Sequence, residues 1–389
     1  MYFVGIDISK YKHDCCIIDD SLSVFARFLF ANDRQGFRDL EAFLDSVPCP
    51  ENEMKIGFEA TSHYALNLKL FLEERHHAFM EFNPILLSKF RSSNTLRRTK
   101  TDSVDSFAIA RFLMTVDFKP YHKGFYHTYS LKSLTRCRSR LIKDRSRYAV
   151  SITNVLDAVF PEYKPFFNGC LSATALYIIE NYPSADRISR LSSASFEKIR
   201  KAVRGKFNAS CFARLKQLAK DSIGLSNDYL EQQLLLYIRL FRSVDSEIRQ
   251  LEEKISEIVL QINPHFLSIH GIGIITAAVI LAECGDIHSF SDPGKLLAFA
   301  GLEPGVYQSG TSGRQGKMVK HGSAYLRCAL INCVLPLIKC NVTFATYYNK
   351  KISEGKPHGV AVTHVAKKLI RVIYTLETQG IDYDENLLR

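Results

Sequence analysis

Residues 2–8, YFVGIDI, are a continuous apolar run that carries one acid, Asp7, near its end. A continuous apolar run of this length predicts a central β-strand that is covered on both faces. A second run, MKIGFE at residues 54–59, has the same character and ends in Glu59. Acidic side chains are seldom buried without a partner, so we expect both acids to have a chemical role.

Further strands and helices are expected on either side of these two runs. Residues about 13–30 predict two more strands in a meander. A helix is then expected from about Asp33, and after the strand at 54–59 the pattern predicts a helix at 64–75, a short strand at 77–82 and a helix at 101–115. Three consecutive strands followed by alternating helices and strands are typical of a ribonuclease H-like sheet. We therefore predict an α/β, RNase H-like domain over residues 1–125.

Two further acids, Asp102 and Asp105, lie three residues apart at the start of the predicted helix 101–115. This spacing places both carboxylates on one face of the helix. Together with Asp7 and Glu59 they supply the oxygen ligands that Mg²⁺ prefers, and a two-metal site holds the attacking and leaving oxygens of a phosphodiester. Taken singly, each acid also has a structural interpretation, such as an N-cap at Asp102. For the four together we favour a metal site.

The composition favours a nucleic-acid partner. The chain has 389 residues, 46% of them hydrophobic, and a net charge of +11. This length predicts two or three domains, and a clustered positive charge favours a polyanionic partner over a merely soluble surface. The ten cysteines form no CxxC pair, and no signal peptide or membrane-spanning run is evident. We expect a cytoplasmic protein of a bacterial or archaeal cell, with no membrane partner.

Residues 126–262 are predicted to be a basic, helical region. The segment 229–262 has the apolar spacing of one long amphipathic helix, which fits a coiled coil and a helical bundle equally well. Cations crowd the preceding helix and the segment 89–100, and we expect them to contact the backbone phosphates of duplex DNA or structured RNA. These candidates are Lys89, Arg91, Arg97, Arg98, Lys100, Lys132, Arg136, Arg138, Arg140, Lys143, Arg145 and Arg147.

Residues 263–345 are predicted to be a mainly α-helical third domain, followed by a helical tail at 346–389. Gly271 and Gly273 form the Gly-x-Gly turn of a helix-hairpin-helix, whose backbone amides point at a phosphate. Residues 303–317 are then expected to be a loop rich in glycine and serine. Three cations in or beside this loop are further candidates for phosphate contacts: Arg314, Lys317 and Lys320.

The chain resembles the DEDD-motif insertion-sequence transposases, which are bridge-RNA-guided DNA recombinases. At the amino end the resemblance rests on GIDISK at residues 5–10, FEAT at 58–61 and KTDSVDS at 100–106. At the carboxyl end it rests on GIG at 271–273, FAGLEP at 299–304, QSG at 308–310 and KHGSAYLR at 320–327. Both sets of motifs occur in the expected order in one chain.

This resemblance implies a RuvC-like first domain in which Asp7, Glu59, Asp102 and Asp105 bind Mg²⁺ or Mn²⁺. It also implies that the last domain supplies a serine nucleophile, which the Gln-Ser-Gly match places at Ser309. Family members act on donor and target DNA as tetramers, with a non-coding guide RNA, and each active site combines domains of two protomers. For this chain the resemblance therefore implies a homo-oligomer, a dimer or a tetramer.

Other functions remain open on the sequence alone. A RuvC-like junction resolvase or nuclease would use the same acids with water as the nucleophile, and would need no serine. Tyr307 and Ser312 are rivals to Ser309 as nucleophile. The residues 5–9 are similar to the first phosphate loop of actin-like sugar kinases, but the other motifs of that class are not in place. A non-catalytic RNA-binding scaffold is supported by charge alone.

Overall fold

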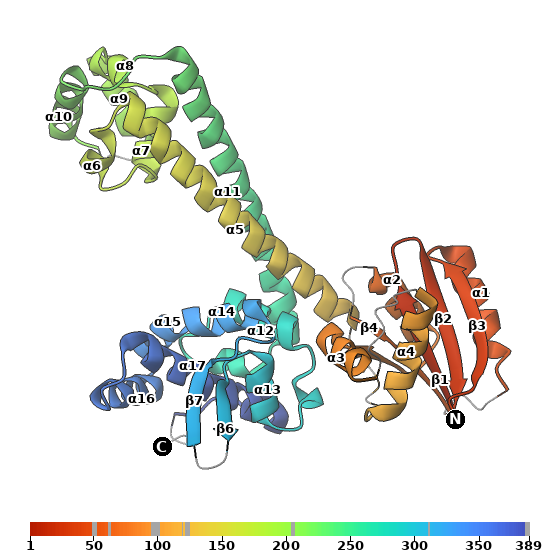
Figure 1. Ribbon diagram of the computed structural model, residues 1–389. Coiled ribbons are helices and arrows are strands. Elements are labelled where there is room, and N and C mark those ends of the chain that lie inside the picture. Colours follow the sequence, from red (N-terminus) through yellow and green to blue (C-terminus); the bar gives the residue numbers. More distant parts are fainter. Residues whose placement is uncertain are drawn as a thin grey trace. The chain divides into compact units, whose positions relative to one another are not determined.

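The computed structural model describes residues 1–48, 53–60, 64–94, 102–118, 120, 125–203, 207–309 and 312–385. The side chains of residues 94, 102, 103, 125–128, 306–309 and 312–317 lie outside the described set. The chain divides into two compact units, Met1–Tyr126 and His127–Arg389. Figure 1 shows the elements of both units.

The first unit is built on a mixed five-stranded sheet, in the order β3-β2-β1-β4-β5. β1 pairs antiparallel with β2 and parallel with β4, which in turn pairs parallel with β5. The sequence therefore predicted the strands of this sheet correctly. Their bounds are β1 Tyr2–Ile8, β2 Lys12–Asp19, β3 Val24–Ala31, β4 Met54–Glu59 and β5 Phe79–Phe82.

Helices cover both faces of this sheet, as the continuous apolar strands predict. On one face, Val4, Ile6 and Phe58 pack with helices α1 (Arg34–Asp45) and α2 (Ala65–Glu74). On the other face, Phe3 and Ile18 pack with α3 (Pro84–Asn94) and α4 (Asp102–Thr115). α1 begins where the sequence predicted, because the Asp33 side chain accepts a hydrogen bond from the Gly36 amide and caps the helix.

α4 lies directly on the central strand. A Cβ atom added at Gly5 of β1 would stand 2.2 Å from the carbonyl oxygen of Ser106 and 2.3 Å from the amide nitrogen of Ala110. Only glycine permits this approach. The first residues of α4, which carry Asp102 and Asp105, are therefore held against β1.

Two long antiparallel helices, α5 (Phe125–Val159) and α11 (Asp228–Ile262), lie in the second unit except for the first two residues of α5. Ion pairs join them: Arg138 to Glu252 at 2.6 Å and Arg145 to Asp245 at 2.6 Å. Figure 1 shows the pair side by side, with a cluster of short helices at one end. The pairing fits the coiled-coil interpretation, and the core at each end fits the bundle interpretation. The short helices are α6 Tyr163–Phe167, α7 Ala173–Asn181, α8 Ala185–Ser189, α9 Ser193–Ala202 and α10 Ala209–Lys220.

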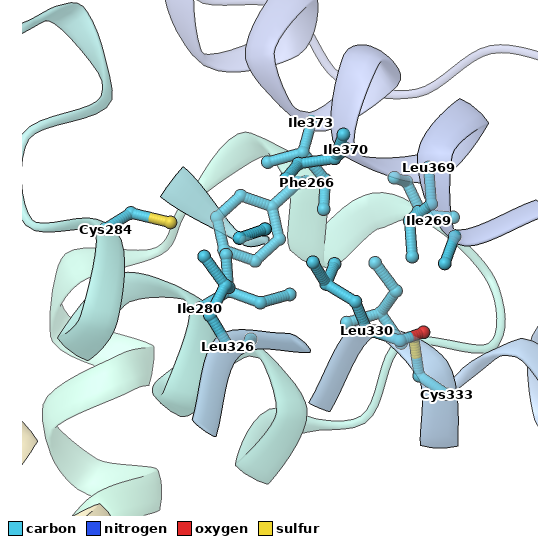
Figure 2. Close-up of a cluster of buried hydrophobic side chains, with 14 of the residues drawn as sticks. Phe266, Ile269, Ile280, Cys284, Leu326, Leu330, Cys333, Leu369, Ile370 and Ile373 are labelled. Atoms are coloured by element: carbon cyan, nitrogen blue, oxygen red, sulfur yellow. The ribbon is translucent and has the colours of Figure 1, made fainter. Parts of the chain in front are cut away.

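The last part of the chain packs around a separate apolar core. Figure 2 shows this core, in which Phe266 lies among Ile280, Leu326 and Ile373. The last of these belongs to α17, so the predicted helical tail at 346–389 contributes to the same core as residues 263–345, and position 345 falls inside α16. The elements are η2 His265–Ser268, α12 Ile274–Cys284, η3 Ile287–Ser289, α13 Pro293–Phe299, β6 Pro304–Ser309, β7 Ser312–Met318, α14 Ala324–Asn332, α15 Val334–Cys340, α16 Val342–Ser353 and α17 His358–Gln379.

The glycine- and serine-rich segment differs from the prediction. Residues 304–309 and 312–318 pair as an antiparallel hairpin, β6 and β7, rather than forming a loop. Strand pairing satisfies backbone hydrogen-bonding groups that an open loop would leave to solvent. In the described part of the chain no single helix meets the length and apolarity needed to cross a membrane, although the bent pair 324–340 and 342–353 does so jointly.

Candidate functional site

Asp7 and Glu59 lie at the carboxyl ends of two neighbouring parallel strands. The register pairs Ile6 of β1 with Phe58 of β4, so the next residue on each strand is one of these acids. Side chains alternate between the faces of a strand, and Ile6 and Phe58 point to the face of α1 and α2. Asp7 and Glu59 therefore both point to the opposite face, which α4 covers.

A third acid, Asp14, lies directly opposite Asp7 on β2. Its strand neighbours Cys15 and Cys16 belong to opposite faces of the sheet, and the alternation places Asp14 on the α4 face as well. Like charges directly opposite one another on a sheet are destabilising. This concentration of carboxylates at one end of one face favours a cation there. Sequence analysis missed Asp14, whose signal was an acid in the middle of a strand pattern.

α4 brings Asp105 to the same face. Asp105 is 6% exposed, and its Oδ1 lies 3.2 Å from Nη1 of Arg91 on α3. The Nε and Nη2 atoms of Arg91 are buried and have no hydrogen-bond partner in the described part of the chain. Arg91 was predicted to contact phosphate, and the structure instead pairs it with a predicted metal ligand. Asp102 is the first residue of α4, and its side chain lies outside the described residues.

The donor set fits a hard divalent cation. All the predicted ligands are carboxylates, and Mg²⁺ and Mn²⁺ prefer oxygen ligands. Among the described side chains, no three or more of His, Cys, Asp and Glu lie close enough together to hold a metal. Asp7, Glu59 and Asp105 thus share a face and an end of the sheet without forming such a group by themselves. The convergence of all four acids stays a prediction.

Ser309 lies at the tip of the β6–β7 hairpin, in the second unit. It is the last residue of β6 and pairs with Ser312, the first residue of β7. Tyr307 pairs with Arg314 lower on the same hairpin. The side chains of these four residues lie outside the described set, as does that of Lys317. A hairpin tip presents a small side chain and adjoining backbone to a ligand with little steric obstruction.

The base of this hairpin is tightly held. Gly301 and Gly322 have left-handed backbones, with φ of 65° and 105°, and a Cβ at Gly322 would stand 2.0 Å from the Phe299 carbonyl oxygen. Arg327 of α14 donates hydrogen bonds to the carbonyl oxygens of Ala300 and Lys320, at 3.2 and 3.3 Å. These contacts fix the segments that enter and leave the hairpin, so its tip is carried by a rigid support.

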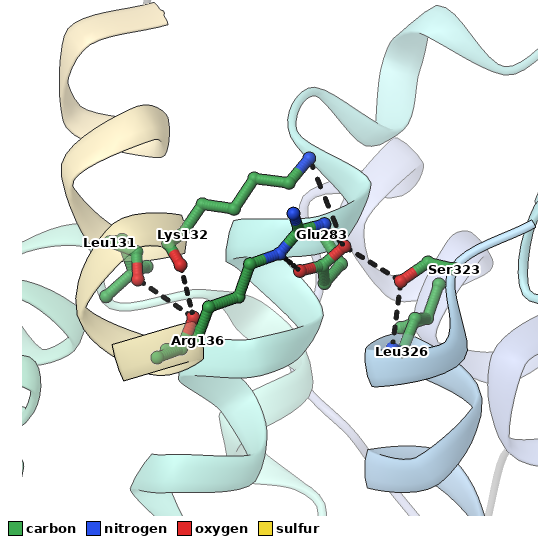
Figure 3. Close-up of polar contacts among 7 residues, drawn as sticks. Leu131, Lys132, Arg136, Glu283, Ser323 and Leu326 are labelled. Atoms are coloured by element: carbon green, nitrogen blue, oxygen red, sulfur yellow. Dashed lines mark hydrogen bonds and ion pairs between the residues drawn. The ribbon is translucent and has the colours of Figure 1, made fainter. Parts of the chain in front are cut away.

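A buried carboxylate, Glu283 of α12, joins this support to α5, as Figure 3 shows. Its side chain is 1% exposed. Arg136 donates to both carboxylate oxygens, at 2.8 and 3.0 Å, and Ser323 Oγ donates at 2.8 Å. Lys132 Nζ lies 3.9 Å away. Ser323 also caps α14 by accepting a hydrogen bond from the Leu326 amide.

The electrostatics of this network favour the ionised carboxylate. Burial raises the pKa of Glu283, but the hydrogen bond from Arg136, the charge of Lys132 and the hydrogen bond from Ser323 together outweigh it and lower the pKa below its usual value. Sequence analysis did not identify Glu283. Its signal was a single acid at the end of the uncharged run 271–282.

The predicted phosphate-binding cations have different surroundings. Arg136, Arg138 and Arg145 form ion pairs with carboxylates of the second unit, and Arg147 pairs with Asp144 on its own helix. Other predicted cations are exposed to solvent: Lys89, Arg140, Lys143 and Lys320. Arg97, Arg98 and Lys100 lie outside the described residues. Phosphate binding by this group stays a prediction.

The Gly-x-Gly turn precedes α12, and the element before the turn is a short 3₁₀ helix, η2. Gly271 has φ of 107°, and a Cβ there would stand 2.6 Å from Cα of Leu337. Close packing against α15 therefore accounts for Gly271. Gly273 is the N-cap of α12, and no atom lies within 4 Å of a Cβ built there.

Comparison with known proteins gives two family matches. Residues 4–161 match the model of the IS110-type DEDD transposases, and residues 263–349 match that of the IS116/IS110/IS902 transposase family. These ranges contain the four predicted acids and Ser309, respectively. Together they include the first unit and the hairpin with its supporting helices.

Relatives of similar length match along nearly the whole chain. The uncharacterized 42 kDa protein of insertion element IS900 from Mycobacterium paratuberculosis is 24% identical over 96% of this chain and 95% of its own length. The mini-circle putative transposase for IS117 from Streptomyces coelicolor is 23% identical over 98% of this chain and 95% of its own length. A pilin gene-inverting protein from Moraxella bovis is 22% identical over 99% and 98%.

Proposed function

The chain belongs to the IS110 family of insertion-sequence transposases, a family of DNA transposases and recombinases, and from this premise we propose how it cuts and rejoins DNA. A divalent metal, Mg²⁺ or Mn²⁺, is held by Asp7, Glu59, Asp102 and Asp105. The nucleophile is Ser309. The observation that carries the proposal is that Asp7, Glu59 and the buried Asp105 share the α4 face at one end of the sheet.

The first unit is proposed to have an RNase H-like, RuvC-like fold. Its strand order, β3-β2-β1-β4-β5 with β2 antiparallel to its neighbours, supports this proposal. In such an arrangement the central strand carries an acid to the sheet edge where parallel strands end. The turn that contains Gly271 and Gly273 is likewise proposed to be a helix-hairpin-helix element, in which the amides of the first turn of α12 face a phosphate.

In the proposed reaction, the Ser309 hydroxyl oxygen forms a new bond to a backbone phosphorus and its proton passes to a base. The bond from that phosphorus to the displaced strand breaks, and the displaced oxygen takes up a proton to end as a hydroxyl. The energy of the phosphodiester is conserved in the phosphoserine, so a second strand end can reverse the step without ATP. The metal, when bound, supplies electrostatic stabilisation of the phosphate's developing charge.

The decisive experiment traps the covalent intermediate. The wild-type protein, with Mg²⁺ and a nicked suicide duplex carrying an end of its own element, is expected to give a protein–DNA adduct that maps to Ser309 after digestion and mass spectrometry. The adduct is expected to be lost in Ser309→Ala, and in Asp7→Asn with the fold intact. An adduct on Tyr307 or Ser312, or one retained in Ser309→Ala, would overturn the assignment.

The same experiment separates the alternative function. A RuvC-like resolvase or nuclease uses water as the nucleophile, so it would cut DNA in Mg²⁺ without any adduct. The predicted acids support both functions equally, and the serine at the hairpin tip favours the recombinase.

Two partners are proposed on the family resemblance. A non-coding guide RNA from the element would pair with both donor and target DNA, and the protein would act as a dimer or tetramer. Mixing Asp7→Asn protein with Ser309→Ala protein tests the assembly, because restored adduct formation requires one active site to use both protomers. Adding and omitting the transcript of the element's non-coding flank tests the RNA.

A further inference from the structure

The helices α16 and α17, to which no function is assigned above, carry a dense group of cations. We define the α16–α17 basic face by Lys351, Lys356, His364, Lys367 and Arg371. Three of these residues, with Lys368, follow one another at positions 364, 367, 368 and 371 of α17. Such i, i+3, i+4 and i+7 spacing places them along one side of the helix, while Val365, Leu369 and Ile373 of the same helix are buried in the core.

The cations of the two helices lie close together. Lys351 of α16 and Lys368 of α17 both contact the ring of Tyr347, at 5.4 and 5.0 Å from its centre. Burial, followed by the charges of Lys367, Lys351 and Lys356, lowers the pKa of His364, against the opposing effect of Glu354. The basic face is therefore one contiguous surface.

Carboxylates do not balance this charge. Residues 342–379 contain six lysines and arginines and only two acids. One acid, Glu354, already pairs with Lys351 at 2.8 Å. The other, Glu377, accepts a hydrogen bond from the Phe266 amide at 3.0 Å. Burial lowers the pKa of Lys367, and so does the charge of Arg371. Bound anions would relieve this repulsion.

Neighbouring residues show where the basic face begins and ends. A groove of about 430 Å³ is lined by Lys368 and Arg371 together with Asp382 and Asp384, so the basic face ends at Arg371, where these two acids adjoin it. In the other direction, α17 packs against α13, which leads into β6, and Lys367 interacts with the charge of Glu303, the residue that precedes β6. The basic face therefore borders the base of the hairpin that carries Ser309.

We propose that the α16–α17 basic face binds the phosphate backbone of duplex DNA and leads it to the β6–β7 hairpin. The contiguous cations, their excess over the acids within residues 342–379 and the hairpin beside them carry this inference. DNA is the partner because the family acts on DNA. The inference rests on that activity and does not depend on the metal or on Ser309. Phosphate contacts of this kind position a duplex without reading its sequence.

The test uses the full-length double variant Lys367→Gln/Arg371→Gln and a fluorescein-labelled duplex DNA of mixed sequence, titrated at several salt concentrations. Each lost phosphate contact lowers the slope of log affinity against log salt by about 0.9. The slope of log affinity against log salt is therefore expected to be shallower by about 1.8 in the double variant. The variant is expected to bind the duplex roughly 60-fold more weakly than the wild type at about 0.1 M salt. Circular dichroism and hydrogen exchange of α17 confirm that the variant is folded.

A matched control removes the same charge elsewhere. Lys201→Gln/Arg239→Gln changes an exposed lysine and an exposed arginine on α9 and α11, and is expected to leave the slope unchanged. Equal weakening in the control, or an unchanged slope in the test variant, would overturn the inference. So would a loss confined to a duplex RNA of the same sequence.

The outcomes of the DNA-binding titration can be told apart from those of the experiment that traps the covalent adduct. At saturating DNA, the Lys367→Gln/Arg371→Gln variant is expected to form the adduct at Ser309 while keeping its reduced salt slope. Failure of the serine assignment would leave the salt slopes intact, whereas failure of the basic face would leave the adduct at Ser309.

Discussion

The substitution Arg136→Ala tests the buried network most directly. It leaves the carboxylate of Glu283, 1% exposed, with the Ser323 hydroxyl at 2.8 Å and Lys132 at 3.9 Å. Removing one partner of a buried ion pair costs about 3–5 kcal/mol. Two neighbours remain and the Arg136 side chain is 41% exposed, so we expect the low end, a loss of about 3 kcal/mol in the free energy of unfolding.

The contribution of Glu283 to the pH dependence of folding stability should change sign in Arg136→Ala. In the wild type the pKa of Glu283 lies below its unfolded value, so its stabilising effect is complete above the unfolded pKa and is lost as the pH falls through the folded pKa. Without Arg136, burial dominates and raises the folded pKa above the unfolded one. The variant should therefore gain stability relative to the wild type as the pH falls toward the unfolded pKa.

Hydrogen exchange of peptides from α12 and α14 provides the local measurement, together with urea unfolding followed by circular dichroism, since the chain has no tryptophan. The double variant Arg136→Met/Glu283→Leu is the control, because apolar replacement of a whole buried pair is often neutral. It should recover most of the loss. An exposed ion pair contributes at most about 1 kcal/mol, so a smaller loss of unfolding free energy in Arg136→Ala would refute the reasoning. The same pH dependence of stability in the wild type and in Arg136→Ala would refute it as well.

Three further predictions follow from individual contacts. Gly5→Ala should push α4 off the sheet, because its Cβ would stand 2.2 Å from a backbone oxygen of α4, and should abolish Mg²⁺-dependent cleavage; Gly359→Ala, with no atom within 4 Å of the added Cβ, is the control, and equal activity in the two would contradict the packing argument. Lys320→Gly should keep or raise stability, since the residue has φ of 54°, but should weaken DNA binding; unchanged binding would remove Lys320 from the interface. DNA should raise the pKa of His364 from its lowered position in the free protein and make binding tighter as the pH falls toward that pKa, as measured by histidine NMR with His364→Gln for assignment; a pKa that DNA leaves unchanged would count against the α16–α17 basic face.

Much of the first unit could be predicted because its pattern is local. The runs at 2–8 and 54–59 are apolar enough to predict buried strands, and their final acids follow from the alternation of side chains. The start of α4 was predicted from its apolar spacing, and the length of α11 from the same periodicity. The motifs that led to the family also lie within short segments, so the sequence was sufficient for them.

Contacts between distant segments were decided only by the tertiary structure. Arg136 and Glu283 are 147 positions apart, and Arg91 was assigned to phosphate before the structure paired it with Asp105. The helical pattern indicates that a cation lies on the surface of its helix. It does not indicate which carboxylate another segment brings near that cation. The same holds for the packing of α17 in the core. Hydrophobic periodicity is set by the backbone of a single element, whereas pairing of charges depends on how separate elements pack, and that information is not contained in any one stretch of the chain.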